Sequence, residues 1–230
     1  RTAAVVEPKG VYVVERRDDR AALVASFLRD APLLIGADGL GVATAAIEPW
    51  PHQLRVSRAL SERFPQRFLL ADEVGLGKTI EVGLALRQLV LDRRVQRALL
   101  LVPHSVIRQW QEELFEKFCL DVPRYEDGKF RTVRGAAWEP RTANPFASEP
   151  LLLVSSQLAK RRDRFEDLLA AGPWDLVVVD EAHHARRHGF ERGLDQPNRL
   201  LALLRALSER TRGLWLLSAT PMQLHPMELW

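Results

Sequence analysis

Two short segments of this 230-residue chain combine residue types that suit triphosphate chemistry. The first is a glycine-rich turn, Gly75-Leu76-Gly77, followed directly by Lys78 and Thr79. Glycines let backbone N–H groups converge on anionic oxygens, and a helix that starts there adds the positive end of its dipole. Lys78 would supply a point charge, and Thr79 would place a hydroxyl on the Mg²⁺ that accompanies a nucleotide triphosphate. This segment predicts a phosphate-binding loop.

The second segment is an apolar run, residues 176–179, that ends in Asp180 and Glu181. Such a run is typical of a buried parallel strand, and ligands of parallel sheets bind at the carboxyl ends of the strands. We therefore expect the acids to share one sheet edge with the phosphate-binding loop. Asp180 would hold Mg²⁺, directly or through water, and Glu181 would polarise the attacking water. The alternative is an acid pair at an ordinary strand end or helix cap.

The segments between and around these motifs alternate regularly, which predicts an α/β fold: a doubly wound parallel sheet with flanking helices. Residues 121–150 contain four prolines and predict an excursion at the sheet edge. The predicted strands are 67–71, 98–102, 151–155, 175–180 and 213–218, and the predicted helices run from the phosphate-binding loop to about Leu91, from an N-cap at Ser105 to Phe118, and over 157–171 and 196–210.

Two regions are predicted along the chain. Residues 1–48 form a lead-in or the tail of an upstream domain, with a strand at 11–14 and a helix at 19–29. Residues 49–230 form the α/β lobe, which opens with a helix that starts at Pro51 and stops before Pro65.

The composition, 47% hydrophobic and 27% charged, is that of a globular protein. The single cysteine, Cys119, excludes an intrachain disulfide and a cysteine-cluster metal site, and it favours a reducing, cytoplasmic location. We expect it to be a small buried residue near a helix end. No apolar run approaches the roughly 18 residues of a membrane span, so no membrane partner is expected. Basic clusters at 160–162 and 186–188 predict either contacts to a nucleic-acid backbone or solvated faces.

The form of the loop, Asp72-Glu73-Val74-Gly75-Leu76-Gly77-Lys78-Thr79-Ile80, resembles motif I of the Swi/Snf-like double-stranded DNA translocases of helicase superfamily two. Asp180-Glu181-Ala182-His183 resembles their motif II, the DEAH box. The resemblance covers about residues 50–230. It implies a RecA-like P-loop lobe that binds ATP and Mg²⁺ through residues 72–79 and Asp180, and that acts on double-stranded DNA.

The resemblance extends to two further motifs. Gln53 lies where the family has a glutamine that binds the adenine edge; the alternative is a solvated helix residue. Residues 101–103, with Gln109 and Trp110, resemble motif Ia, which implies that Pro103 and His104 contact the phosphates of the tracked strand. Alternatively, Pro103 merely ends a strand and Trp110 belongs to the core, and for Trp110 we favour the core.

Motifs Ib and III follow in the family's order. Ser155 and Ser156 are implied to lie near the nucleic-acid backbone, although serines at this position could equally cap the next helix. Ser218 and Thr220 belong to the Ser-Ala-Thr motif that couples the nucleotide state to the grip on the strand. We expect His183 of motif II to form a hydrogen bond toward this motif.

Finer details resemble the bacterial RapA-like branch of the family, which implies RNA polymerase as a candidate partner. Motors of this family place the nucleotide between two lobes, and the second lobe donates arginine fingers. The chain ends at Trp230, just past motif III. We therefore expect it to be the first lobe of a longer protein, to be nearly inactive alone, and to have a second RecA-like lobe as its partner. The alternatives are an RNA-directed helicase and a non-cycling nucleotide-binding module that contacts RNA polymerase.

Overall fold

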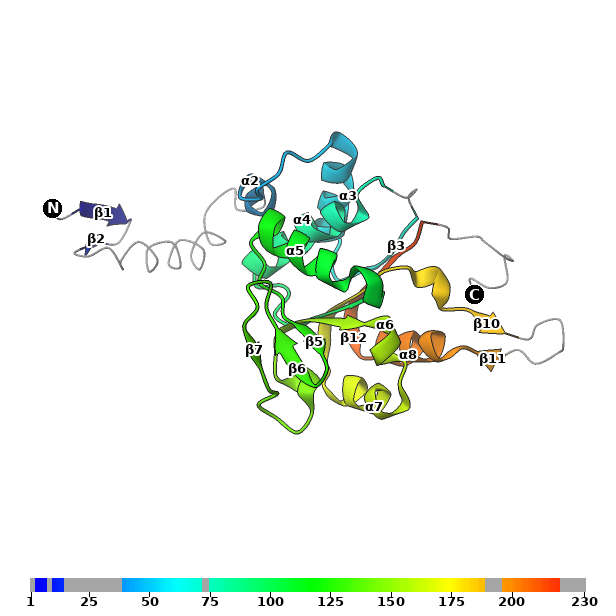
Figure 1. The fold of residues 1–230 in the computed structure, drawn as a ribbon. Coiled ribbons are helices and arrows are strands. Elements are labelled where there is room, and N and C mark those ends of the chain that lie inside the picture. The colour runs from blue at the N-terminus through cyan, green and yellow to red at the C-terminus, as the bar shows by residue number, and fades with distance from the viewer. Residues whose placement is uncertain (1–2, 8–9, 15–38, 72–74, 189–195, 220–230) are drawn as a thin grey trace.

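The computed structural model describes residues 3–7, 10–14, 39–71, 75–188 and 196–219. Its centre is an eight-stranded sheet with the order β3-β12-β9-β4-β8-β5-β6-β7 (Figure 1). Neighbouring strands from β3 to β5 in this order pair in parallel, and β6 and β7 continue the sheet in antiparallel pairing. The strands are β3 (Arg67–Leu70), β4 (Ala98–Val102), β5 (Arg124–Glu126), β6 (Lys129–Arg131), β7 (Ala137–Trp138), β8 (Leu151–Ser155), β9 (Trp174–Val179) and β12 (Thr211–Leu217).

Helices cover both faces of this sheet, as Figure 1 shows. Side chains of a strand alternate between the two faces, so Leu100 of β4 packs in one core cluster and Leu99 in the other. The doubly wound α/β fold predicted from the sequence is confirmed. One face carries α3 (Pro51–Glu62), α4 (Lys78–Leu91) and α5 (Ile107–Phe118), and the other carries α6 (Ser156–Ala159), α7 (Arg162–Ala170) and α8 (Arg199–Ser208).

Helix α4 is the most enclosed of the described helices, because every residue from Glu81 to Leu89 is buried. It contacts α3, α5 and the short helix α2 (Leu40–Ala43). A Cβ at Gly83 would lie 2.2 Å from the Phe118 ring of α5, so glycine permits the close packing of these two helices. The backbone N–H of Gly41 donates to Oε1 of Gln88 at 2.6 Å, which ties α2 to α4. Residues 39–47 thus adjoin the lobe, while the domain boundary at residue 48 remains a prediction.

Three predicted helix boundaries were wrong. Ser105 is not an N-cap: a short 3₁₀ turn, His104–Val106, precedes α5, whose N-cap Val106 makes no side-chain hydrogen bond. The helix predicted over 157–171 is divided into α6 and α7, because Arg161 between them has extended backbone (φ −67°, ψ 140°). Helix α8 starts late, because Asn198 accepts a hydrogen bond from the Leu201 N–H and caps it.

The predicted excursion at 121–150 adds strands to the sheet edge. Strands β5 and β6 are joined by Asp127 and Gly128, which have φ values of 51° and 79°. Positive φ at both central residues is the requirement of a type I′ hairpin, and Asp-Gly is a strong sequence signal for it. This signal was overlooked. Short turns complete the region, including Pro145–Ala147, whose Phe146 packs edge-on against Tyr125.

Cys119 was predicted to be buried, and that prediction was wrong. The residue caps the end of α5 in the left-handed conformation (φ 51°), and its side chain is exposed. The left-handed residue turns the chain out of the helix, and the Leu120 N–H then donates back to the Leu114 carbonyl at 2.9 Å, which is the usual geometry of a helix C-cap. The cysteine is therefore near a helix end, as expected, but outside the core.

The N-terminal region contains a hairpin of β1 (Ala3–Glu7) and β2 (Gly10–Val14), and β2 includes the predicted strand 11–14. The helix predicted at 19–29 lies outside the described residues. A second small ribbon pairs β10 (Arg187–His188) with β11 (Gln196–Pro197).

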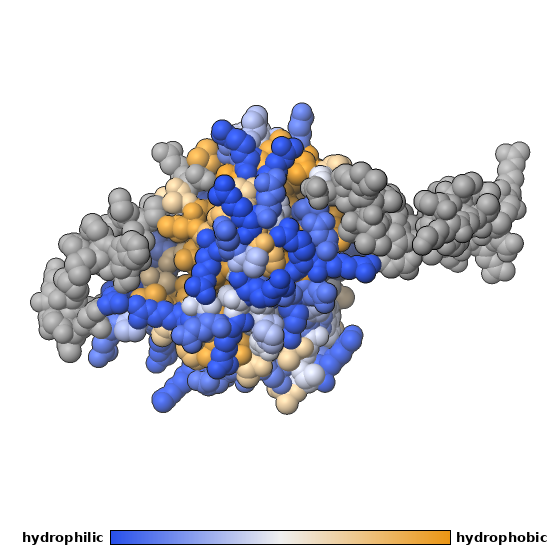
Figure 2. Space-filling view, turned by 180° about the vertical axis from the view of Figure 1, so that it is seen from behind, coloured by the Kyte–Doolittle hydropathy of each residue, from blue (hydrophilic) through white to orange (hydrophobic). Residues whose placement is uncertain are grey.

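The surface of the described part is largely hydrophilic. Figure 2 shows the face opposite to Figure 1, where hydrophilic side chains surround small apolar areas. Within the described ranges, the exposed large apolar side chains are Trp50, at 59% exposure, and Leu69, at 50%. Among these residues there is also no helix that is both long and apolar enough to cross a membrane.

Candidate nucleotide-binding site

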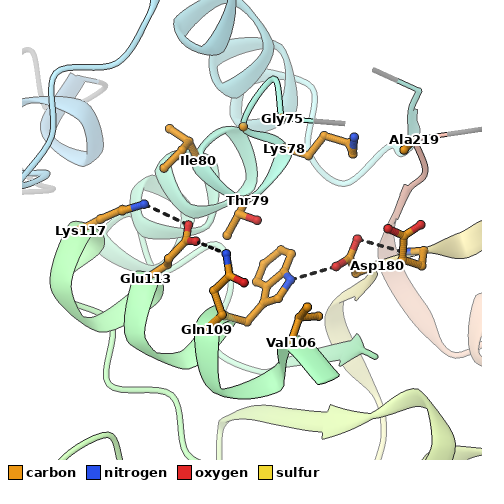
Figure 3. A pocket seen from close by; sticks show the side chains of 13 residues that line it. Gly75, Lys78, Thr79, Ile80, Val106, Gln109, Glu113, Lys117, Asp180 and Ala219 are labelled. Atoms are coloured by element: carbon orange, nitrogen blue, oxygen red, sulfur yellow. Dashed lines mark hydrogen bonds and ion pairs between the residues drawn. The ribbon is translucent and has the colours of Figure 1, made fainter. Parts of the chain in front are cut away.

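A cavity of about 440 Å³ lies between the start of α4, the side of α5 and the carboxyl ends of β9 and β12 (Figure 3). The glycine-rich turn and the acid pair both line it, which confirms the prediction that they share one sheet edge. The volume is in the range of small-ligand pockets. Its lining residues are Gly75, Gly77, Lys78, Thr79, Ile80, Val106, Gln109, Trp110, Glu113, Lys117, Asp180, Glu181 and Ala219.

The glycine-rich turn has the backbone that a phosphate-binding loop needs. Gly75 and Gly77 have φ values of 89° and 85°, in the left-handed region that favours glycine. Gly77 is the N-cap of α4 and has no side chain that could accept from the first N–H groups of the helix. The positive end of the helix dipole therefore faces the pocket. Lys78 extends across the pocket toward the side formed by Asp180 (Figure 3). Asp72, Glu73 and Val74, predicted to bind ATP, lie outside the described residues.

Gln53 supports this turn from α3. Its side chain is 7% exposed, so the alternative of a solvated helix residue was wrong. Nε2 donates to the Leu76 carbonyl at 3.1 Å, and Oε1 accepts the Trp50 N–H at 3.0 Å. A Cβ at Gly77 would lie only 2.4 Å from Nε2. The amide therefore holds the turn against the helix, and its contact with adenine remains a prediction.

Asp180 follows β9 and is held by donors on both carboxylate oxygens. Oδ1 accepts the Glu181 N–H at 2.9 Å, and Oδ2 accepts the Trp110 indole N–H at 2.9 Å. Burial is the largest influence on this carboxyl and raises its pKa, while the two hydrogen bonds and the charge of Lys78 oppose the shift. The site thus holds a partly desolvated carboxylate beside a cation.

The indole of Trp110 has a contact that the sequence did not predict. The residue belongs to the core, as favoured, with 3% exposure, and its indole also reaches the pocket. The contact with Asp180 was not foreseen. A buried indole N–H usually requires an acceptor, which was the available signal, but the sequence does not show which acceptor lies nearby.

Glu181 and His183 connect the acid pair to the following motif. Glu181 has a left-handed backbone (φ 51°, ψ 47°), a conformation that is costly for a residue with a side chain and is found at functional sites. Its Oε2 lies 3.0 Å from Nδ1 of His183. The same nitrogen lies 3.3 Å from Oγ of Ser218, which confirms the predicted hydrogen bond toward motif III. Thr220, the other predicted coupling residue, lies outside the described residues.

The loops predicted to contact nucleic acid follow the neighbouring strands β4 and β8. The His104 N–H, directly after Pro103, donates to Oε1 of Gln157 at 2.9 Å, so the two loops are joined. Ser155 caps α6 by accepting the Leu158 N–H at 3.1 Å, as the capping alternative proposed. Ser156 is buried as well and donates to Gln157. Contacts of these four residues with nucleic acid remain predictions.

One wall of the pocket contains two residues that the sequence analysis missed, Glu113 and Lys117. Glu113 of α5 accepts a hydrogen bond from Gln109 at 2.9 Å and lies 3.1 Å from Nζ of Lys117. Because residues four apart lie on one face of a helix, this spacing could have identified the three as a row. The row closes the side of the pocket next to Thr79 (Figure 3).

The oxygen ligands that the pocket offers suit a magnesium ion that is bound together with a triphosphate. Thr79 and Asp180 line the same pocket and offer a hydroxyl and a carboxylate. Mg²⁺ usually takes one or two such protein ligands and completes its shell with phosphate oxygens and water. Among the described residues no group of three or more histidines, cysteines or acids could hold a metal ion by itself. The donor set therefore suits Mg²⁺ bound together with a nucleotide.

Comparison with known proteins gives consistent matches. The sequence profile of the SNF2-related domain matches residues 52–230. The RNA polymerase-associated protein RapA of Pseudomonas aeruginosa (strain LESB58) is 42% identical over 186 residues, which are 81% of this chain and 18% of that protein. The RapA of Vibrio campbellii (strain ATCC BAA-1116) is 42% identical over 175 residues, 76% of this chain and 17% of that protein. The chain thus spans less than a fifth of the length of these relatives.

A solved structure shares the fold. The Sulfolobus solfataricus SWI2/SNF2 ATPase core in complex with dsDNA aligns with 81% of this chain and 35% of its own length, with a TM-score of 0.60 and 18% identity. At this identity the likeness concerns the fold, and it agrees with the RecA-like lobe expected from motif I.

Proposed function

Because the chain belongs to the SNF2-related domain family, we propose that it is the ATP-binding lobe of a nucleic-acid-dependent ATPase of the Swi/Snf type that acts on double-stranded DNA. The observation that carries this proposal is the pocket shared by the glycine-rich turn and the acid pair. The double-stranded DNA held by the Sulfolobus structural neighbour supports the choice of nucleic acid.

Each pocket residue has a role in the proposed reaction. The N–H groups at the start of α4 and Lys78 bind the β- and γ-phosphates, and Thr79 and Asp180 hold Mg²⁺. When bound, Mg²⁺ neutralises charge on the phosphate oxygens. Glu181 orients the attacking water, and His183, 3.0 Å from its Oε2, fixes the direction of this carboxylate.

The partners of the lobe are also part of the proposal. A second RecA-like lobe would close over the pocket and donate an arginine to the transferring phosphate. Such a residue is worth about 10³–10⁵ in rate, so residues 1–230 alone are expected to hydrolyse ATP very slowly. The name of the bacterial relatives supports RNA polymerase as a partner. The cytoplasmic location suggested by the single cysteine stays a prediction.

The test is an ATPase assay on the full-length native protein with double-stranded DNA, with RNA and without nucleic acid. We expect double-stranded DNA to stimulate hydrolysis most. Lys78→Ala and Glu181→Gln should abolish turnover, and Glu181→Gln should keep or tighten ATP binding, because it removes only the group that orients water.

Matched controls come from the α5 wall. Lys117→Ala and Glu113→Gln remove the same charges from the same pocket, but these side chains pair with each other at 3.1 Å. Both controls should retain turnover near the wild-type level. Stronger stimulation by RNA would favour the RNA-directed helicase, and a lack of stimulated hydrolysis in the full-length protein would favour a non-cycling module.

A further inference from the structure

The Trp110 indole is the side chain that joins α5 to the magnesium-binding side of the pocket. It is buried in the core cluster between α5 and the sheet, and its N–H donates to Oδ2 of Asp180 at 2.9 Å. Trp110 is therefore fixed by packing on one side and by a hydrogen bond on the other. A rigid side chain of this kind can set the direction of a carboxylate.

The second carboxylate oxygen of Asp180 is also held, because Oδ1 accepts the Glu181 N–H at 2.9 Å. A donor at hydrogen-bond distance on each oxygen fixes the plane of the carboxylate. Each oxygen has two lone pairs, so each keeps one acceptor site for a cation or its water. Of the two donors, the Glu181 N–H belongs to the adjacent backbone, whereas the indole comes from a distant element and can be removed by substitution.

We propose that Trp110 is a positioning residue, whose indole N–H holds the Asp180 carboxylate in the orientation that binds Mg²⁺ with the nucleotide. This inference rests on the proposed function. In this role Trp110 acts through Asp180, to which its indole N–H donates. Outer partners of metal ligands typically contribute 10- to 100-fold to metal affinity or activity, which sets the expected effect.

The test compares Trp110→Phe with Trp215→Phe in the full-length native protein. Trp215 is a matched control: it is fully buried in the same core cluster, and its indole N–H has no hydrogen-bond partner within the described residues. The readout is the binding of a fluorescent ADP analogue as Mg²⁺ is titrated. We expect Trp110→Phe to raise the Mg²⁺ concentration for half-maximal effect about 10- to 100-fold. Trp215→Phe should stay within about twofold, because it leaves Asp180 untouched.

A second variant separates the hydrogen bond from packing. Benzothienylalanine at position 110 replaces the indole N–H by sulfur at nearly the same volume, so it should keep the thermal stability of the wild type and show the same raised Mg²⁺ requirement. In EDTA all variants should bind the nucleotide equally, because the glycine-rich turn is intact.

The outcomes are distinct. A wild-type protein that shows no Mg²⁺-dependent nucleotide binding would refute the proposed function and this inference with it. A wild-type protein that binds, together with position-110 variants whose Mg²⁺ requirement is unchanged, would overturn the inference alone. Equal shifts in the Trp110 and Trp215 variants would also overturn it, since they would indicate a general effect of core packing.

Discussion

Substitution of Gly77 by alanine should destabilise the lobe more than substitution of Gly75. Both glycines have left-handed backbone, with φ values of 85° and 89°. Among the described residues, a Cβ at Gly75 would meet nothing within 4 Å, whereas a Cβ at Gly77 would lie 2.4 Å from Nε2 of Gln53. The two substitutions therefore share the backbone cost and differ in the displacement of one side chain.

The magnitudes follow from these contacts. An L-residue in the left-handed region costs about 1–2 kcal/mol, which is the expected loss for Gly75→Ala. Gly77→Ala would also displace Gln53, which makes hydrogen bonds to the Leu76 carbonyl and the Trp50 N–H. Each hydrogen bond contributes about 0.5–1.5 kcal/mol, so the additional loss is about 1–3 kcal/mol.

The assay is urea unfolding of the chain, followed by tryptophan fluorescence, for both glycine variants and for Gln53→Ala. In the Gln53→Ala background, Gly77→Ala should cost no more than Gly75→Ala, because the clash partner is gone. Equal losses for the two glycine variants in the wild-type background would contradict the predicted clash between residue 77 and Gln53. So would a cost of Gly77→Ala that Gln53→Ala leaves unchanged.

Two further predictions concern the core and the electrostatics of the sheet. Gly83→Ala should lower the free energy of unfolding by about 1–3 kcal/mol in the same assay, since its Cβ would lie 2.2 Å from the Phe118 ring; a stabilised variant would contradict the packing of α4 on α5. Partial burial, the largest influence on Asp175, raises the pKa of its carboxyl, but two backbone N–H groups and Arg212 together bring that pKa below its ordinary value of 3.8. The folded state thus favours the carboxylate, and its stabilisation is present above the unfolded pKa and is lost as the pH falls through the folded pKa. Asp175→Asn should cost about 1 kcal/mol at pH 7, and unfolding curves that show the same difference at pH 3 would count against this assignment.

The fold was predictable where one local signal dominated. Continuous apolar runs located β4, β8 and β9 to within one residue, because a strand buried on both faces is apolar along most of its length. Helix boundaries were less predictable, since they depend on single backbone conformations. Nothing in the composition of the segment indicates that Arg161 is extended and divides α6 from α7.

The two motifs of the candidate site could be predicted from the sequence, but most of the hydrogen bonds among its residues could not. The turn at 75–79 and the acids at 180–181 follow from residue types and from the rule for parallel sheets. The hydrogen bond between Trp110 and Asp180 joins residues 70 positions apart, and only the three-dimensional packing of α5 determines it. The hydrogen bond from the Gln53 amide to the Leu76 carbonyl of the turn is likewise determined only by the three-dimensional packing.

The burial of α4 on all sides limits which part of the pocket can move. Since residues 81–89 have no free side, the helix cannot slide or rotate without unpacking three neighbouring helices and the sheet. The glycine-rich turn proposed to bind phosphate is therefore followed by a rigidly packed helix. If the proposed function is correct, a motion that responds to the γ-phosphate would begin on the other side of the pocket. There Glu181 has an uncommon backbone geometry, and Nδ1 of His183 lies close to both the Glu181 carboxylate and Oγ of Ser218.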